Sequence, residues 1–341
     1  MLDLHRLRLL RELKHRGTLA AVAAALSYSP SSVSQQLSVL ESEVGVALLE
    51  PVGRRVRLTE QAEILVAHTE VLLERLERAE ADIAASVTAV TGTLRVAAFQ
   101  TAALTLVPSA LTLLRDDHPE LRVHVTQAEP EGALPALLAR DVDLVVAEEY
   151  PGHAVPRSTG IDSADLCADE IRLALPPNSA DAVRLTLPPN SADAVRLALP
   201  ADKAAAAHTP EAARAAAPAH PPEAALRALS GHPWAMEPAG TASRQWATAL
   251  CREAGFEPEV RFESPDLLVQ LRLVEQGHAV ALLPDLLWGG STPSVPLLRL
   301  PDRAGTRRLF TAVRHGSGGH PAVRACRAAL VRAMERTRCL P

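Results

Sequence analysis

The 341-residue chain has few cysteines, few aromatic residues and only two lysines. Its four cysteines, Cys167, Cys251, Cys326 and Cys339, form no CxxC pair and have no histidine nearby at metal-ligand spacing. The 12 histidines form no metal-ligand pattern either. We therefore expect the reduced, structural thiols of a cytoplasmic protein that uses no metal and no cofactor.

Features typical of membrane, secreted and catalytic proteins are also missing. No unbroken apolar run reaches the length of a membrane span, and residues 1–17 form an amphipathic, charged helix rather than a signal peptide. The sequence has no nucleophile elbow, phosphate-binding loop or paired-carboxylate pattern, which argues against an enzyme. With 48% apolar residues the chain can bury sizeable cores, and its length predicts two or three domains.

Charge is distributed unevenly along the chain. The net charge is -5, yet residues 1–58 hold eight Lys/Arg against five Asp/Glu, so this part is basic and the remainder is acidic. A basic N-terminal part on an acidic body is the asymmetry expected of a protein that binds nucleic acid through one end.

Residues 18–40 have the pattern of a helix-turn-helix. Apolar side chains recur at helical spacing in two groups: Leu19, Val22, Ala23 and Leu26, then Val33, Leu37 and Leu40. Residues 27–29 break the pattern between them, and Pro30 stands where a first helical turn tolerates proline. We expect the start and the polar face of the second helix to contact double-stranded DNA, through Ser29, Pro30, Ser31, Ser34, Gln35 and Ser38. An ordinary helical hairpin is the alternative interpretation.

The following segment favours DNA binding. Residues 41–49 are predicted to continue as a short helix with a break at Gly45, and GRRVRLT at 53–59 indicates a tight turn into a strand. Arginines around a glycine turn suit a wing that contacts the phosphate backbone, whatever the base sequence. We expect Arg54 and Arg55 to make these contacts.

The order and spacing of LDLHRLRLLRELKHRGTLAAVAAAL, SPSSVSQQLSVLESEVGVALLE and GRRVRLT within residues 2–65 resemble the LysR-type transcriptional regulators. The resemblance covers essentially the whole chain. Two departures are Pro51, where the wing usually has another basic residue, and Gln61-Ala62, where Ala-Gly is usual. The resemblance implies a winged helix-turn-helix DNA-binding domain at 1–59, a linker and dimerisation helix at 60–90, and an effector-binding domain at 91–341. A thiol sensor, as in some oxidant-responsive relatives, has no motif to support it in this sequence.

Residues 60–90 are predicted to form a helix of about eight turns. Its apolar stripe consists of Ile64, Ala67, Val71, Leu72 and Ile83. Such a stripe must be buried against something, and a partner chain is one candidate. The resemblance implies an antiparallel pairing and a homodimer or homotetramer, in which two recognition helices read a symmetric site.

Beyond residue 91 the hydrophobic period changes. Strands are predicted at 93–99, 121–128 and 142–147, with helices at 104–117 and 132–140 between them, and a similar block spans about 165–283. The chain then returns to a final helix at 320–336. We predict an α/β fold, in which an α-rich winged helix-turn-helix head precedes a two-lobed, doubly wound effector domain that resembles periplasmic binding proteins. Lobe 1 would hold about 91–161 and 285–341, and lobe 2 about 162–284.

In such folds a ligand lies between the lobes, where strands end and helices begin. The candidate effector contacts at these ends are Gln100, Thr101, Glu148, Thr241, Ser243, Ser264 and Ala281. Each polar member could instead cap its helix, and for Ser264, before Pro265 and Asp266, capping is as good an interpretation as ligand contact.

A twelve-residue repeat is the most unusual stretch. RLALPPNSADAV at 172–183 recurs as RLTLPPNSADAV at 184–195, and 196–207 begins in the same way. A solenoid would need more copies and a hydrophobic ladder. We interpret the repeat as a slippage duplication in which one copy pairs in a sheet and the others form a surface loop.

These observations together predict a sequence-specific DNA-binding transcriptional regulator that senses a small-molecule effector, acts as a homo-oligomer and has no membrane partner. The first alternative is a solute-binding or transport protein, because the effector fold is shared. The second is an enzyme fused to a DNA-binding head. The basic head and the absence of a signal peptide argue against the former, and the absence of catalytic motifs argues against the latter.

Overall fold

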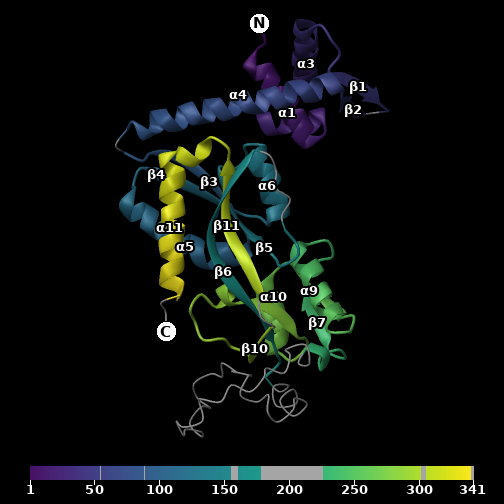
Figure 1. Cartoon of the computed structure of the whole chain (residues 1–341), viewed down its shortest axis with the longest axis vertical. Helices are drawn as coiled ribbons and strands as arrows, with labels where there is room; N and C mark the ends of the chain where they lie inside the picture. The colour runs from purple at the N-terminus through teal and green to yellow at the C-terminus, as the bar shows by residue number, and fades with distance from the viewer. Residues whose placement is uncertain (54, 88, 155–159, 178–225, 301–304, 339–341) are drawn as a thin grey trace.

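The chain forms a small N-terminal head, a long helix α4, and an elongated body of two lobes (Figure 1). The computed structural model describes every residue except 54, 88, 155–159, 178–225, 301–304 and 339–341. The predicted fold class is confirmed, because an α-rich helix-turn-helix head precedes a two-lobed α/β body.

Short polar residues set the starts of the three head helices, α1 (Leu4–Arg16), α2 (Leu19–Leu26) and α3 (Pro30–Val44). Asp3, Thr18 and Ser29 each accept a hydrogen bond from a backbone amide in the first turn of the helix that follows. These caps satisfy amide groups that have no partner inside the helix. The helices enclose a leucine-rich core that includes Leu10, Leu13, Leu37 and Leu40.

The segment after the recognition helix differs from the prediction. The helix expected at 41–49 is confirmed up to its break at Gly45, since α3 continues to Val44, and it is wrong for 46–49, which are not helical. Gly45 ends α3 in the left-handed conformation with φ 78°, which glycine adopts without strain. Residues beyond it form an antiparallel hairpin of β1 (Leu49–Val52) and β2 (Arg55–Leu58), as the wing requires.

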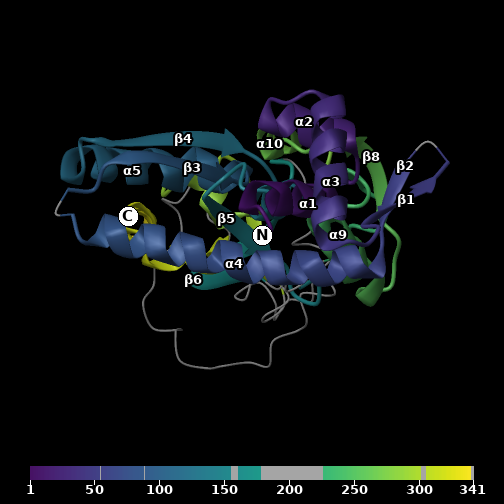
Figure 2. The ribbon, with the colours of Figure 1, turned by 90° about the horizontal axis from the view of Figure 1, so that it is seen from above.

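Helix α4 (Glu60–Ala85) leaves the hairpin and passes along the head and over the body (Figure 2). The face that it buries within its own chain consists of Ala62, Val66, Thr69, Leu73, Glu77 and Ala81. The stripe predicted from sequence lies elsewhere on the helix. Ile64, Val71, Leu72 and Ile83 are all more than half exposed in one chain.

Close contacts hold α4 and the head on the body. The Glu77 carboxylate of α4 pairs with Arg140 at 3.1 Å and Arg314 at 2.5 Å. Gly316 has φ 88°, and a Cβ there would lie 2.5 Å from the Glu74 carbonyl oxygen, so glycine permits this approach. In the head, Arg16 pairs with Asp141 at 2.8 Å.

Lobe 1 is built on a parallel core of three strands, β3 (Gly92–Ala98), β4 (Leu121–Gln127) and β5 (Leu144–Glu149). Helices α5 (Gln100–Asp117) and α11 (Pro321–Arg338) bury Leu106, Leu114, Cys326 and Leu330 in one core with this sheet. Helix α6 (Pro130–Leu138) packs in a separate core with Val145 and Phe310. Helices therefore cover both faces of the sheet, as a doubly wound fold requires.

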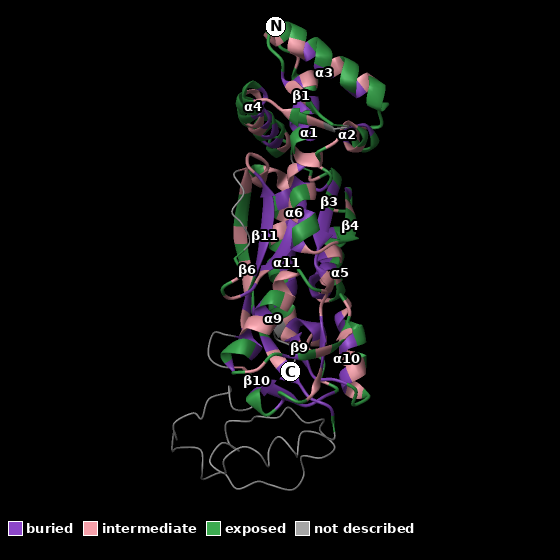
Figure 3. Cartoon of the chain, turned by 90° about the vertical axis from the view of Figure 1, so that its right-hand side faces the viewer, coloured by how far each residue is buried: buried purple, intermediate pink, exposed green. Residues whose placement is uncertain are grey.

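Two long strands carry the chain between the lobes. Strand β6 (Ile161–Ala174) pairs antiparallel with β11 (Thr306–Arg314), and the sheet order is β10-β6-β11-β5-β3-β4. Figure 3 shows β11 as a largely buried strand, whereas the lobe 1 half of β6 is partly exposed. The lower end of β6 continues into lobe 2, where it pairs with β9 and β10.

The elements of lobe 2 are β7 (Pro233–Met236), α9 (Ala242–Glu253), β8 (Glu259–Glu263), α10 (Leu267–Glu275), β9 (Ala281–Pro284), the 3₁₀ turn η3 (Asp285–Trp288) and β10 (Leu297–Arg299). Its core contains Trp234, Trp246 and Leu250. The first copy of the repeat contributes 172–174 to β6, between β9 and β10. The second and third copies, 184–195 and 196–207, lie outside the described residues.

Candidate DNA-binding surface and effector cavity

The outer face of α3 has the division that a recognition helix needs. Val33, Leu37 and Leu40 are at most 1% exposed and face the head core. The predicted DNA-contact residues on and beside the opposite face, Ser29, Pro30, Ser31, Ser34, Gln35 and Ser38, are all exposed. Figure 3 shows this helix at the outer edge of the head, away from the body. The surface is therefore accessible to a DNA groove.

The hairpin beside α3 carries the predicted wing arginines. Arg54 lies outside the described residues, and Arg55 begins β2, with nothing described of its side chain. Arg57, a third arginine of this strand, is 73% exposed and pairs with Glu50 across the hairpin at 2.6 Å. Part of the positive charge of the wing is therefore engaged within the hairpin itself.

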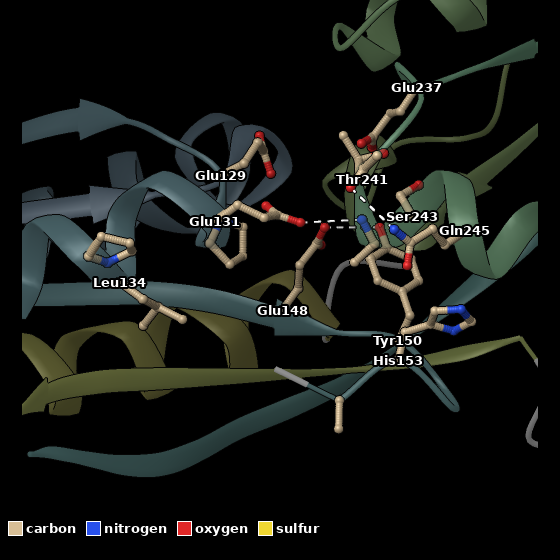
Figure 4. Close-up of a pocket in the computed structure, with 15 residues that line it drawn as sticks. Glu129, Glu131, Leu134, Glu148, Tyr150, His153, Glu237, Thr241, Ser243 and Gln245 are labelled. Carbon is tan, nitrogen blue, oxygen red and sulfur yellow. Dashed lines mark hydrogen bonds between the residues drawn. The ribbon is translucent and has the colours of Figure 1, made fainter. Parts of the chain in front are cut away.

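A cavity of about 480 Å³ lies between the lobes, in the size range of small-molecule sites. We call it the interlobe cavity. Residues of α6, β5 and the β5–β6 segment line it from lobe 1, and residues around the start of α9 line it from lobe 2 (Figure 4). Its lining residues are Glu129, Pro130, Glu131, Leu134, Pro135, Glu148, Tyr150, His153, Ala154, Glu237, Gly240, Thr241, Ala242, Ser243 and Gln245.

Three of the predicted effector contacts, Glu148, Thr241 and Ser243, line this cavity. Thr241 also caps α9, because its hydroxyl accepts a hydrogen bond from the Arg244 amide at 3.2 Å. The Glu148 carboxylate accepts a hydrogen bond from the Tyr150 hydroxyl at 2.9 Å.

The other four predicted contacts do not line the interlobe cavity. Ala281 is fully buried in β9, paired with Ala174 of β6. Thr101 is fully buried, and its hydroxyl accepts a hydrogen bond from Arg307. The Ser264 hydroxyl accepts a hydrogen bond from the Asp266 amide, and Asp266, not Ser264, caps α10, so the capping interpretation of Ser264 is wrong.

Gln100, the fourth of these residues, joins the two lobes. Its amide group donates to the Asp266 carboxylate at 2.6 Å, and its side-chain oxygen accepts from the Leu267 amide at 2.8 Å. A second bridge crosses at the cavity, where the Ala242 amide donates to the Glu131 carboxylate at 3.3 Å. The starts of α9 and α10 are therefore each held by a side chain from lobe 1.

A buried arginine lies behind the Glu148 wall. Arg307 of β11 is 1% exposed and forms ion pairs with Glu148 and Asp169. Burial opposes its charge, but these carboxylates raise its pKa above the usual value. The guanidinium also lies 5.1 Å from the centroid of the Phe99 ring. Arg307 thus connects strands β5, β6 and β11 where the lobes meet.

Two lining carboxylates hold protons more tightly than usual. Burial, reinforced by the nearby Glu148, raises the pKa of Glu129 to about 7. The same causes raise the pKa of Glu237 to about 8, although the Ser243 and Thr241 hydroxyls hydrogen-bond its carboxylate. Near neutral pH both groups therefore titrate within the cavity.

Several cavity residues were not predicted from the sequence. Glu129 and Glu131 follow β4, and Glu237 follows β7, so the strand-end rule that selected Glu148 also applies to them. Tyr150 and His153 had no such signal. Tyr150 is 5% exposed, and its ring packs against Trp246 with 5.3 Å between centroids, a contact that joins β5 to α9.

Metal and thiol chemistry find little support in this structure. The part of the chain that the structure describes contains no cluster of three or more His, Cys, Asp or Glu side chains that could hold a metal ion. Burial raises the pKa of the Cys251 and Cys326 thiols to about 12. Both stay protonated at neutral pH, and the thiolate is the reactive form.

Comparisons with known proteins agree with this geometry. Residues 4–63 match the sequence model of the bacterial regulatory helix-turn-helix protein, lysR family. Residues 88–205 and 180–335 match that of the LysR substrate binding domain. The chain therefore belongs to the LysR family of bacterial regulators. It is a sequence-specific DNA-binding transcriptional regulator with an effector-binding domain, and it acts as an oligomer.

Individual relatives are distant. A probable hydrogen peroxide-inducible genes activator of Mycobacterium xenopi is 32% identical over 167 residues, which are 49% of this chain and 84% of that protein. The transcriptional dual regulator GltC of Bacillus subtilis is 23% identical over 292 residues, which are 86% and 84% of the two chains.

Solved structures share the fold at low sequence identity. A full-length OxyR variant from Pseudomonas aeruginosa superposes with a TM-score of 0.63 at 16% identity, over 97% of this chain and 95% of that one. Full-length BenM gives a TM-score of 0.51 at 16% identity, over 100% and 99%. None of the helices described here is long and apolar enough to cross a membrane.

Proposed function

We propose that α3 and the wing make different kinds of contact with DNA. Ser29, Pro30, Ser31, Ser34, Gln35 and Ser38 read base edges and nearby phosphates from the exposed face of α3, and Arg54 and Arg55 hold the phosphate backbone. The observation that carries this assignment is the buried stripe of α3 opposite its exposed polar face. Positioning by phosphate contacts and selection by base contacts are separate roles in DNA recognition.

We further propose that residues 1–59 are the DNA-binding domain, 60–90 the linker and dimerisation helix, and 91–341 the effector-binding domain. Within the last, lobe 1 comprises about 91–161 and 300–341, and lobe 2 about 162–299. The boundary expected at 284/285 moves because η3 and β10 pack with the core of lobe 2. The interlobe cavity receives the effector, and Glu148, Thr241 and Ser243 contact it. The other four residues have structural roles: Gln100 bridges the lobes, Thr101 pairs with Arg307, Ser264 holds the Asp266 amide before α10, and Ala281 lies in β9.

Helix α6 links the interlobe cavity to the head through contacts at its two ends. Its first turn, with Pro130 and Glu131, lines the cavity. At its other end the Leu138 carbonyl accepts a hydrogen bond from Arg11 of α1, and Arg16 pairs with Asp141 just beyond. An effector that prefers one arrangement of the lobes would shift α6 and so bias the position of the head.

The protein works in the cytoplasm and is not an enzyme. DNA is the partner of the head, and the sequence carries no catalytic motif that would make the cavity an active site. The peroxide response in the name of the mycobacterial relative is not carried over, because Cys251 and Cys326 are buried thiols with raised pKa values.

The first test is binding of the full-length protein to the intergenic DNA beside its own gene, across a series of salt concentrations. We expect tight, sequence-selective binding with a steep salt dependence, since several phosphate contacts release counterions. Random DNA of equal length is the control. Equal affinity for both DNAs would refute the proposed role of the α3 face.

A further inference from the structure

The interlobe cavity lies at the starts of α6 and α9, yet the charged side chains that line it are mainly acidic. Among the residues that the structure describes, four glutamates line it, Glu129, Glu131, Glu148 and Glu237, and no arginine or lysine does. Arg307 is committed to Glu148 and Asp169 and is 1% exposed, behind the wall. Among the described residues, no arginine or lysine forms an ion pair with Glu129, Glu131 or Glu237. His153 is the one basic side chain among the described lining residues.

The features that would attract an anion are already occupied. A helix N-terminus offers free amides and a positive dipole to a negative ligand. At α9, however, the Ala242 amide already donates to the Glu131 carboxylate. At α6 the first residue, Pro130, has no amide proton, and Glu129 precedes it. The chain's own carboxylates therefore take the place where an anionic ligand would bind.

Part of the remaining wall is apolar, although Thr241, Ser243 and Gln245 also belong to it. Pro130, Leu134, Pro135 and Ala154 line the cavity, and the Tyr150 ring, packed against Trp246, forms part of the same wall. A hydrated inorganic cation gains little from such a surface, whereas an organic ligand buries carbon against it. An aromatic face beside carboxylates also favours an organic ammonium or guanidinium group.

We propose that the effector of this regulator is an organic cation, a primary amine or guanidine on an apolar body, held between the carboxylates of Glu129 and Glu237. This inference rests on the proposed role of the interlobe cavity as the effector site. Glu148 and Glu131 add to the negative field from lobe 1, and the apolar wall receives the body of the ligand.

The raised pKa values of Glu129 and Glu237 predict whether protons are released or taken up when a ligand binds. With pKa values of about 7 and 8, Glu129 and Glu237 are partly protonated at pH 7.5 when the cavity is empty. The charged groups around them are Glu131, Glu148 and Arg307, and the His153 ring also lines the cavity. A bound cation favours the ionised carboxylates, so protons leave on binding, whereas a bound anion favours the protonated carboxylates and protons are taken up.

Calorimetry of the full-length protein at pH 7.5 tests the charge of the ligand. The probes are benzylamine, 1,4-diaminobutane and agmatine, with benzoate and succinate as anions of similar size. Titrations in two buffers of different ionisation enthalpy give the number of protons exchanged. We expect at least one amine or guanidine to bind with proton release and to bind more tightly at pH 8.5 than at pH 6. We expect no binding of either carboxylate.

Substitutions of cavity residues test whether the amine binds in the interlobe cavity. Glu237→Gln and Glu129→Gln keep the side-chain shape but remove a charge, and each should weaken the amine about tenfold. Glu257→Gln, an exposed residue of lobe 2 paired with Arg252, is the matched control and should leave affinity unchanged. Ala154→Trp, which fills the cavity, should abolish binding.

Three results would overturn the inference: binding of a carboxylate with proton uptake, no binding by any amine or guanidine, or amine binding that the three cavity variants do not weaken. Carboxylate binding abolished by Ala154→Trp would leave the cavity as the effector site and remove only the assigned charge. The salt series on promoter DNA decides the DNA-binding proposal separately.

Discussion

At the scale of single residues, charge and hydrogen-bonding capacity decide what each side chain can do. Arg307 illustrates this, because a buried guanidinium is tolerable only with two carboxylates and a hydroxyl around it. On α3 the opposite condition holds, since exposed short side chains are left without a fixed partner in the core. Arg307 and its partners stabilise the junction between the lobes. The exposed side chains of α3 are available to DNA.

Two substitutions in the head should separate base selection from backbone binding. Gln35→Ala removes an amide that can pair with a base edge, so we expect discrimination at particular base pairs to fall by about 1–3 kcal/mol. Arg55→Ala removes a phosphate contact, so binding to every sequence should weaken and the salt slope should decrease by about 1.

Competition binding with a library of operator variants, repeated at four salt concentrations, measures both effects, and each variant is the control for the other. An unchanged base preference in Gln35→Ala would remove that residue from the reading face. An unchanged salt slope in Arg55→Ala would remove the wing contact.

The pKa of Glu237 has a consequence for stability. In the unfolded chain the carboxyl titrates near 4.5, and in the folded chain near 8, so between these values the folded state holds a proton that the unfolded state has lost. The free energy of unfolding should therefore fall as pH rises through this window. Glu237→Gln should be about 1–3 kcal/mol more stable than wild type at pH 8 and similar to it at pH 5.

Urea unfolding at pH 5, 6.5 and 8 gives the comparison. Glu257→Gln is the control, because Arg252 lowers the pKa of that exposed carboxyl and no loss of stability toward pH 8 is expected from it. A Glu237→Gln variant that loses stability with pH in parallel with wild type would contradict the assignment.

At the scale of elements, α4 has two apolar faces, one buried within its own chain and one exposed. One packs on the head and lobe 1 through Ala62, Val66 and Leu73. The other carries Ile64, Val71 and Leu72, which a single chain leaves exposed. An exposed apolar stripe on a helix of 26 residues fits pairing with a second copy of the chain, as the oligomeric state of the family requires.

Leu72→Asp should convert the oligomer to a smaller species. A charge in an apolar helix pair is left desolvated and without a partner, so the dimer dissociation constant should rise at least about tenfold. Light scattering coupled to gel filtration measures the mass. Leu104→Asp, an equally exposed leucine on α5, is the control. Identical masses for wild type and Leu72→Asp across dilution would exclude this face as the interface.

At the scale of the whole molecule, the long strands β6 and β11 determine how the lobes meet. Because β6 passes from lobe 1 into lobe 2, its first repeat copy already fills the place between β9 and β10. The two matches to the LysR substrate binding domain overlap at 180–205, within the repeat, as a duplicated segment would produce. The position between β9 and β10 is therefore occupied by the first copy.

Deletion of residues 184–195 should be neutral. We expect the melting temperature to stay within about 2 °C of wild type, since less than ~0.5 kcal/mol is at stake, and DNA affinity to be unchanged. Hydrogen exchange on the wild type should protect 172–174 but neither 184–186 nor 196–198. Protection of all three copies, or a variant that fails to fold, would contradict the interpretation of the repeat.

Much of the head was determined by sequence alone. The caps at Thr18 and Ser29, the stripe of Val33, Leu37 and Leu40, and the turn at Gly53 are local patterns, and each one acts on neighbours only a few residues away. The local pattern failed at 46–49, where a helix was expected beyond Gly45 and the chain instead leads into β1.

The interlobe cavity and the choice between the faces of α4 were decided by tertiary structure. Strand ends identified Glu148, Thr241 and Ser243, but only the crossing of β6 and β11 brings residues 129–154 beside 237–245. The same packing turns Ala281 into the sheet and Gln100 toward α10. The periodicity of apolar residues specifies which side chains share one face of a helix or strand. Contacts between segments a hundred residues apart depend instead on how whole sheets pack, and no short stretch of sequence encodes that packing.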